Sequence, residues 1–226
     1  AAEGAAIAIA DIADGSAAAA EIAAEYGVET MAATVDVSDE ASVEALVGEV
    51  MAKFGRIDVL VNNAALFATL PLQPHEEIST EMWDSVMAVN VRGPFLMVKH
   101  VSPHMRAAGY GKIINIASGT VNKGMPHMLA YVTSKSALLG FTRSLSRELG
   151  NDGICVNTLS PGLIESPSVM ENPHHLELTE RVLASRAMKR VATPQDLLGA
   201  VVFLAGPGSD FITGQTLAVD GGSINT

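Results

Sequence analysis

The sequence predicts an α/β fold in which helices cover both faces of a doubly wound parallel sheet, giving three layers in the order αβα. Two observations carry this prediction. Short apolar runs rich in Ile, Val and Ala alternate with longer segments of helical composition along the 226 residues. A chain of this length has room for one α/β domain with a large core, so residues 1–226 are expected to form a single domain.

The first half of the chain is expected to contain three strands and three helices. Alanine's helix propensity explains the first helix, and the first two helices end at Gly27 and Gly55. Ser38 is the expected N-cap of the second helix. The third is predicted as one long helix. In order, the ranges are strand 6–11, helix 16–26, a short strand through 34–35, helix 38–54, strand 57–61 and helix 79–108.

The second half continues the alternation. Thr193 is expected to cap the last helix, with Pro194 at its first position and Asp196 at its third, because this arrangement satisfies unpaired amides at a helix start. The ranges are strand 112–116, helix 128–149, strand 154–159, a helix after Thr193 and strand 216–219. The carboxyl ends of parallel strands share one edge, where ligands bind. The residues expected to gather there are Asp11, Asp36, Asn62, Ser118 and Pro161.

Composition excludes several classes of function. The net charge of -11, with only 14 Lys and Arg, argues against a nucleic-acid or anionic-membrane partner, since both need a basic patch. No apolar run approaches the length of a membrane span, and no signal peptide is readable. Cys155 is the single cysteine, which fits a reducing cytoplasm. His174 and His175 lack a third ligand, so no metal site is expected.

The segment from Ser118 to Lys135 carries a hydroxyl, a phenol and an amine. Tyr131 and Lys135 are four residues apart, so a helix would place both on one face. A nearby cation favours phenolate and would lower the tyrosine pKa from about 10 toward a value useful for proton transfer. Glycines and a proline in the intervening loop would return Ser118 to the same place. The alternative is an exposed helix pair without chemistry.

Asn90 is a further candidate because of the residue four positions after it. A helical carbonyl normally accepts from that amide, and here the position is Pro94, which has no N–H. The Asn90 carbonyl would then be free to hold a water. The alternative is that Gly93 and Pro94 merely bend a long helix.

Several short motifs follow one another in order. They are Asp11 after a strand, D-V at Asp36 and Val37, N-N-A-A from Asn62, V-N-V at Asn90, I-A-S at Ser118, Y-V-T-S-K from Tyr131 to Lys135, N-T-L-S-P-G ending at Gly162, and I-T-G-Q-T-L-A-V-D-G-G near the end. Together they closely resemble the short-chain dehydrogenase/reductase family over essentially the whole chain. Chance supplies one such motif, but not the ordered set.

The resemblance implies a Rossmann-like dinucleotide-binding catalytic domain. Its implied catalytic tetrad is Asn90, Ser118, Tyr131 and Lys135: the tyrosine is the acid/base, the serine steadies the substrate oxygen, the lysine lowers the tyrosine pKa and holds the nicotinamide ribose, and the asparagine supports a relay water. The implied cofactor contacts are Asp11, Ile12, Asp36, Val37, Asn62, Ala64, Tyr131, Lys135, Pro161, Gly162, Ile164 and Ser166.

Charge favours NAD as the cofactor. Asp11 at a strand end is placed to accept hydrogen bonds from the adenosine ribose hydroxyls, and its carboxylate would repel a 2′-phosphate. The first 52 residues contain no Lys or Arg to neutralise that phosphate. The alternative for Asp11 is a helix-capping or solvated loop acid, and Asp36 could equally cap the next helix.

Two features depart from the family pattern. The family's first strand and its T-G-x-x-x-G-x-G turn, whose amides hold the pyrophosphate, are absent from this sequence. That strand is central, so its absence is expected to leave two open edges inside the sheet, and roughly two to three dozen upstream residues are expected to be missing. Ala65 stands where the family usually has glycine, which requires that its φ is not positive.

The substrate is expected to be an alcohol or carbonyl compound of medium size, largely apolar or aromatic. A lid is predicted over residues 163–191, a long and mainly apolar segment. The run P-G-L-I-E-S resembles the branch with pyridoxal 4-dehydrogenase and aryl-alcohol dehydrogenases. An NAD-dependent oxidoreductase is therefore expected, and a noncatalytic Rossmann-fold subunit is the alternative. Helices 79–108 and 128–149 resemble the family's dimer-forming pair, so a homodimer or homotetramer is expected.

Overall fold

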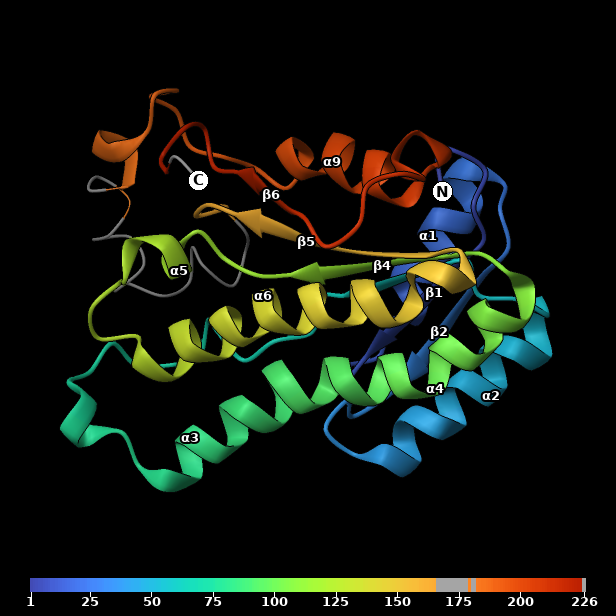
Figure 1. The fold of residues 1–226 in the computed structure, drawn as a ribbon, viewed down its shortest axis with the longest axis horizontal. Helices are drawn as coiled ribbons and strands as arrows, with labels where there is room; N and C mark the ends of the chain where they lie inside the picture. Colours follow the sequence, from blue (N-terminus) through green and yellow to red (C-terminus); the bar gives the residue numbers. More distant parts are fainter. Residues whose placement is uncertain (166–178, 180–181, 225–226) are drawn as a thin grey trace.

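A computed structural model describes residues 1–165, 179 and 182–224. Every strand pair in this part of the chain is parallel. Helices lie on both sides of the sheet, with α4 and α6 on one side of β4 and β5 and α9 on the other (Figure 1). The structure therefore confirms the predicted α/β fold with a parallel sheet.

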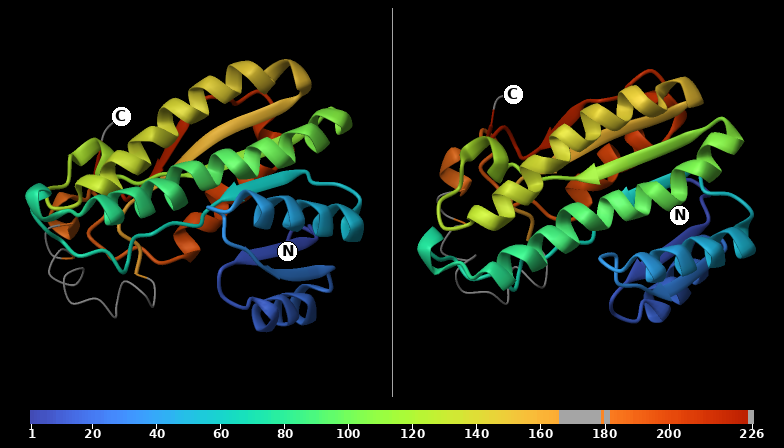
Figure 2. Two further views of the ribbon diagram at one scale, coloured as in Figure 1. Left: turned by 90° about the horizontal axis from the view of Figure 1, so that it is seen from below. Right: turned by 60° about the horizontal axis from the view of Figure 1, so that its bottom comes forward.

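The N-terminal segments form a sheet of their own. Strand β1 (Ile7–Asp11) pairs only with β2 (Thr30–Thr34) among the described strands, and helix α1 (Ser16–Tyr26) packs on β2. This block lies beside α2 (Glu40–Phe54), which in turn packs on α4 (Figure 2). The parallel sheet is therefore divided between β1 and β3, at the position where the sequence predicts two open edges.

The second sheet has the order β3-β4-β5-β6. Its strands are β3 (Val59–Asn62), β4 (Gly111–Ile116), β5 (Ile154–Pro161) and β6 (Thr216–Val219). Every residue of β5 is buried, as expected for a strand covered on both faces. Apolar side chains from β3, β4, β5, α2, α4 and α6 form the largest core cluster described, which holds the two central strands in place.

The helix predicted over residues 79–108 is interrupted. It consists of α3 (Thr80–Met87), a π-helical turn (Ala88–Arg92) and α4 (Gly93–Ala108), which begins with Pro94 in its first turn. On the same side lies α6 (Leu129–Leu149), and α9 (Gln195–Ala205) covers the opposite side. The sequence did not predict the short helices α5 (Thr120–Lys123), His75–Glu77, Gly150–Asp152 and Pro207–Ser209.

Two predicted caps are wrong in detail. Asp39, and not Ser38, caps α2 by accepting from the Ala41 amide, because the Ser38 hydroxyl donates to Asp36 instead. At α9 the N-cap is Pro194, and the Asp196 carboxylate reaches back to accept from the Thr193 amide at 2.8 Å. In contrast, Gly27 and Gly55 end α1 and α2 at φ 67° and 73°, left-handed values that glycine adopts without strain.

The described part of the chain has no helix long and apolar enough to cross a bilayer. It also has no group of three or more His, Cys, Asp or Glu side chains arranged to hold a metal ion. His174 and His175 lie outside the described residues. Cys155 is buried as a free thiol on β5, and its Sγ donates to the Asp210 carbonyl.

Candidate active site

A cleft of about 360 Å³ opens at the carboxyl ends of β4, β5 and β6. Segments that are far apart in the sequence meet there because parallel strands end at one edge of the sheet. The predicted site residues that line it are Ser118, Tyr131, Lys135, Pro161, Gly162 and Ile164. The structure thus brings the three groups of the Ser118 to Lys135 segment into one cavity.

Tyr131 and Lys135 lie in the first two turns of α6. Both are buried, with 7% and 3% of their surface exposed, so the alternative of an exposed pair is excluded. Lys135 Nζ lies 5.9 Å from the centre of the Tyr131 ring and donates a 2.7 Å hydrogen bond to the Ile116 carbonyl. The ring of Phe67 lies 4.7 Å from that of Tyr131 and forms part of the cleft wall.

Burial controls the ionisation of this pair. Loss of solvent raises the pKa of Tyr131 to about 12, and a hydrogen bond with Ser118 opposes this rise only in part. Loss of solvent also lowers the pKa of Lys135 to about 8. The pKa of Tyr131 therefore lies above the ordinary tyrosine value, because burial outweighs the hydrogen bond with Ser118. That Lys135 lowers this pKa stays a prediction. The resting side chain of Tyr131 is a protonated phenol.

The Ser118 hydroxyl has a defined direction. Its Oγ accepts from the Thr120 amide at 3.2 Å and from the Thr120 hydroxyl at 3.0 Å. A serine hydroxyl has two acceptor positions and one proton. With both acceptor positions used by Thr120, Ser118 can only donate its proton into the cleft. Thr120 was missed by the sequence reasoning, although a hydroxyl two residues after a candidate serine is a usable signal.

Asn90 is fully buried in the π-helical turn and does not line the cleft. Its side-chain oxygen accepts from the Leu66 amide at 2.8 Å, and its Nδ2 donates to the Leu66 carbonyl and to Ser134 Oγ. Ser134 in turn donates to the Tyr131 carbonyl at 2.7 Å. Asn90 therefore connects the loop after β3 to the helix that carries Tyr131. The water held by its carbonyl remains a prediction.

Asn62 belongs to a buried polar chain rather than to the cleft wall. Its Nδ2 donates to Asn115, whose own Nδ2 donates to Thr142, and Thr158 also donates to Thr142, each at 2.8 Å. These side chains link β3, β4, α6 and β5 behind the cleft. Ala64 and Ala65 follow at the exposed strand end. The φ of Ala65 is not positive, as the substitution for glycine requires.

The residues predicted around the adenosine lie at the other sheet. Asp11 ends β1 and accepts from the Ala13 amide through one carboxylate oxygen, and Ile12 beside it is 73% exposed. The Asp36 carboxylate accepts from the amide and hydroxyl of Ser38, and these hydrogen bonds lower its pKa. Asp36 thus orders the turn before α2, and Val37 beside it packs on Leu96 and its neighbours.

Ser166 and just over half of the predicted lid, residues 163–191, lie outside the described residues. The described start of this segment is anchored, since the Glu165 amide donates to the Ala192 carbonyl at 2.8 Å. Gly162 packs so closely that a Cβ on it would lie 3.0 Å from the Asp220 side chain, which accounts for glycine at this turn.

Comparisons with known proteins agree with this geometry. A model of the family described as Enoyl-(Acyl carrier protein) reductase matches residues 1–223. The 2-(R)-hydroxypropyl-CoM dehydrogenase of Xanthobacter autotrophicus is 39% identical over 87% of this chain and 78% of its own.

Two solved structures share the fold. A gluconate 5-dehydrogenase from Burkholderia cenocepacia, in complex with NADP and tartrate, has a TM-score of 0.87 and 33% identity over 98% of this chain and 87% of its own. A 3-ketoacyl-(acyl-carrier-protein) reductase from Brucella melitensis, complexed with NADH, has a TM-score of 0.85 and 34% identity over 96% and 87%. With its fold, its ordered motifs and these relatives, the chain belongs to the short-chain dehydrogenase/reductase family, whose members are oxidoreductases that use a nicotinamide cofactor.

Proposed function

We propose that the protein is an NAD-dependent alcohol dehydrogenase or carbonyl reductase acting on a medium-sized, largely apolar or aromatic substrate. The observation that carries this proposal is the convergence of Ser118, Tyr131 and Lys135 in one cleft, with both α6 side chains buried. Burying the Tyr131 phenol and the Lys135 amine costs free energy, and apolar side chains at the same positions would avoid this cost. A chemical role accounts for the presence of this buried pair.

The side chains suit the reduction of a carbonyl to an alcohol. The cofactor, when bound, supplies the hydride that the carbonyl carbon accepts. Tyr131 is a protonated phenol and can transfer its proton to the carbonyl oxygen, while Ser118 donates a hydrogen bond to the same oxygen. In the reverse direction the oxygen returns its proton to the tyrosine oxygen. Lys135 would hold the nicotinamide ribose and replace the proton that Tyr131 gives up.

The choice of NAD rests on Asp11. Its carboxylate is exposed at the end of β1, and only one of its oxygens has a hydrogen-bond partner among the described residues. The other oxygen suits a ribose hydroxyl and would repel a 2′-phosphate. Asn62 and Ala64 at the end of β3 and Pro161, Gly162 and Ile164 at the end of β5 complete the proposed cofactor contacts, with Asp36 and Val37 at the adenine.

The substrate side of the cleft is mainly apolar. Its wall contains Phe67, Met125, Met128, Leu163 and Val182. Such a wall favours a ring or a short chain over a phosphorylated sugar. The proposal also includes a homodimer or homotetramer in the cytoplasm. The exposed apolar side chains of α4 and α9 support the oligomer. The free, buried Cys155 supports the cytoplasmic location.

The test is NADH formation with a panel of primary, secondary and aromatic alcohols, and its reversal with the matching carbonyl compounds. We expect activity with NAD to exceed activity with NADP by at least tenfold. Tyr131→Phe is expected to lower kcat by about 10²- to 10⁴-fold, the usual contribution of a general acid, while NAD binding remains. A folded protein that binds neither dinucleotide would overturn the proposal.

A further inference from the structure

A second cation lies in the cleft beside the catalytic group. Lys123, the last residue of α5, lines the cleft together with Ser118 and Tyr131. Its Nζ donates to Ser185 Oγ at 2.9 Å and makes a short hydrogen bond to Ser223 Oγ. These two hydroxyls come from the segments before α9 and after β6, so Lys123 is held at the junction of three distant parts of the chain.

Lys123 forms no direct ion pair with a described side chain, although the charge of Asp220, in the same cleft, acts on it. Its hydrogen-bond partners are neutral hydroxyls, and the Asp220 carboxylate is already hydrogen-bonded to other groups. The Asp220 carboxylate accepts from the amides of Gly222, Ser223 and Ile224 at 2.9 to 3.2 Å. Asp220 thus stabilises its own turn, and Lys123 remains a cation without an ion pair in the described structure.

Arg186 adds a second positive charge behind this end of the cleft. It is 3% exposed, and its Nη2 donates to the Leu163 carbonyl at 2.6 Å. Its Nε is buried without a partner in the described part of the chain. Asp220 acts on both Lys123 and Arg186, and Asp196, the other acid that acts on Arg186, is already paired with Arg190. The two cations therefore share one carboxylate that is hydrogen-bonded elsewhere, in a protein of net charge -11. Such a local excess of positive charge attracts an anionic group.

A purely structural role does not account for a lysine at this position. A neutral amide side chain could hold two hydroxyls equally well, without a charge. Lys123 is exposed overall, but partial loss of solvent and the charge of Arg186 lower its pKa, against the opposing charge of Asp220, so the charged form has a small cost here. A bound anion would offset that cost.

We propose that Lys123 binds a carboxylate carried by the substrate, so that the enzyme acts on hydroxy or oxo compounds with an apolar body and an anionic end. This inference rests on the proposed function, because it assumes that the cleft holds the substrate. The apolar wall would contact the body, Tyr131 the reacting oxygen and Lys123 the carboxylate, with Ser185 and Ser223 fixing the direction of the ammonium group.

The cofactor phosphates are a less suitable partner for Lys123. One partner of Lys123, Ser223, follows β6 at one edge of the four-stranded sheet, whereas Asp11 ends β1 in the separate sheet. Figure 1 shows α5 on the left of the molecule and β1 on the right. An anion bound by Lys123 therefore lies away from the end of the cleft assigned to adenosine.

The test compares two probes of matched shape, phenylacetate and phenylacetamide, by calorimetric titration in the presence of excess NAD. We expect the unmodified protein to bind the acid at least about tenfold more tightly than the amide, the usual worth of a hydrogen bond to a charged group. Lys123→Met should lower this ratio about tenfold, and Lys123→Arg should preserve it.

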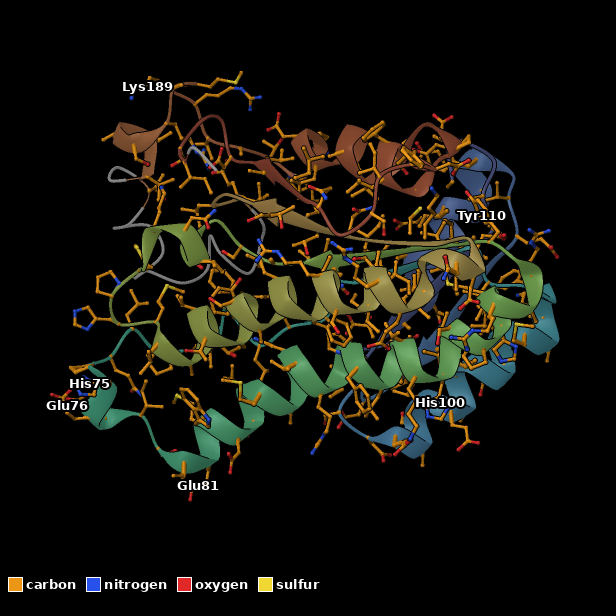
Figure 3. The ribbon with its side chains drawn as sticks, in the orientation of Figure 1. His75, Glu76, Glu81, His100, Tyr110 and Lys189 are labelled. Atoms are coloured by element: carbon orange, nitrogen blue, oxygen red, sulfur yellow. The ribbon has the colours of Figure 1, made fainter. Side chains whose placement is uncertain are left out.

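The matched control is Lys189→Met, which removes the same charge. Lys189 is exposed, donates to the Ala184 carbonyl and lies at the outer edge of the molecule (Figure 3). This variant is expected to keep the ratio of acid to amide affinity, which shows that proximity to the cleft is what matters. NAD affinity should be the same in the Lys123 and Lys189 variants.

An equal affinity for acid and amide in the unmodified protein, or an unchanged ratio in Lys123→Met, would overturn the inference. If Lys123→Met lost affinity for both probes and for NAD together, the inference would also be overturned, because such a loss indicates a structural role for Lys123. The two proposals can be separated. Acid binding that depends on Lys123 without any alcohol oxidation would support this subsite and defeat the proposed function, whereas oxidation without a preference for acids would do the reverse.

Discussion

The direction of the Ser118 hydroxyl depends on one neighbouring residue. Thr120 occupies both acceptor positions of Ser118 Oγ, through its amide and its own hydroxyl. The serine proton is therefore left for the phenol or for a substrate oxygen. Thr120 is a positioning residue, since it does not need to touch the substrate to set this direction.

Replacing Thr120 by valine tests this arrangement. Thr120→Val keeps the side-chain shape but frees one acceptor position, so Ser118 can rotate away from its donor role. We expect kcat to fall about tenfold, at the low end of what one oriented donor contributes, with little change in KM for NAD. Steady-state kinetics would show this, and Thr120→Ser should restore the rate. Equal impairment of the serine variant would contradict the role of the hydroxyl.

The buried pair makes stability depend on pH in two opposite ways. Lys135 has a pKa of about 8 in the folded protein against a reference value of 10.5, so between these values only the unfolded chain holds the proton and stability rises with pH. Tyr131 has a pKa of about 12 against a reference of 10.0, so above pH 10 only the folded protein holds its proton and stability falls.

A lysine variant isolates the first of these effects. Between pH 8 and pH 10 the Lys135 contribution is expected to add about 2 kcal/mol to the free energy of unfolding, from 1.36 kcal/mol for each pKa unit. Lys135→Met should remove this gain. Urea unfolding at the two pH values measures the difference between the variant and the unmodified protein. An identical gain in both proteins would show that other groups cause it.

At the scale of elements, Asn90 lies at an interruption between two helices and joins the loop after β3 to α6. The π-helical turn between α3 and α4 places its side chain against the Leu66 backbone, and both polar groups of that residue are satisfied by Asn90. Pro94 in the sequence indicated the position of the irregular turn correctly. The side-chain contacts of Asn90 could not be predicted locally, because they join residues 24 positions apart.

Asn90→Ala is expected to destabilise the fold. It leaves the Leu66 amide and carbonyl without their Asn90 partner and removes one of the two hydrogen bonds of Ser134, which should cost about 2–4 kcal/mol. Asn122→Ala is the control, since Asn122 is exposed on α5, and its effect should stay within about 0.5 kcal/mol. Chemical denaturation measures both. A neutral Asn90→Ala would refute the connecting role.

At the scale of the molecule, apolar side chains remain exposed on two sides. Leu198, Val202 and Phe203 project from α9, Phe211 is fully exposed after it, and Phe95 is half exposed on α4. The two helices lie on opposite sides of the sheet (Figure 1). Two separate apolar faces suit the proposed homodimer or homotetramer, since each could bury its surface against a second copy.

A charge placed on one of these faces should weaken association. Phe211→Asp is expected to reduce the mass of the assembly in analytical ultracentrifugation, because an interface must then desolvate a carboxylate. Ala52→Asp adds the same charge at an exposed position of α2, a helix that does not carry Phe211, and should leave the mass unchanged. If the unmodified protein sedimented as a monomer at micromolar concentration, the proposed homodimer or homotetramer would be wrong.

The order of strands and helices and the identity of Ser118, Tyr131 and Lys135 could be read from the sequence, because periodicity and motif order are properties of neighbouring residues. The bounds of β6 and α1 were predicted to the residue, whereas β2 spans Thr30–Thr34 and not a short strand through 34–35. The cap at Asp39 was not predicted, since Ser38 and Asp39 are both good caps and only the contact of Ser38 with Asp36 decides between them.

The tertiary structure decided what the cleft does to these groups. Burial, which no local pattern reports, leaves Tyr131 a phenol and weakens the charge on Lys135. The tertiary structure also places Lys123 beside the hydroxyls of Ser185 and Ser223, which are 62 and 100 positions away in the sequence. The sequence by itself determined the fold and the candidate reacting residues. Desolvation and long-range contacts, which exist only once the strands have met at one edge, determined their protonation and the second cation in the cleft.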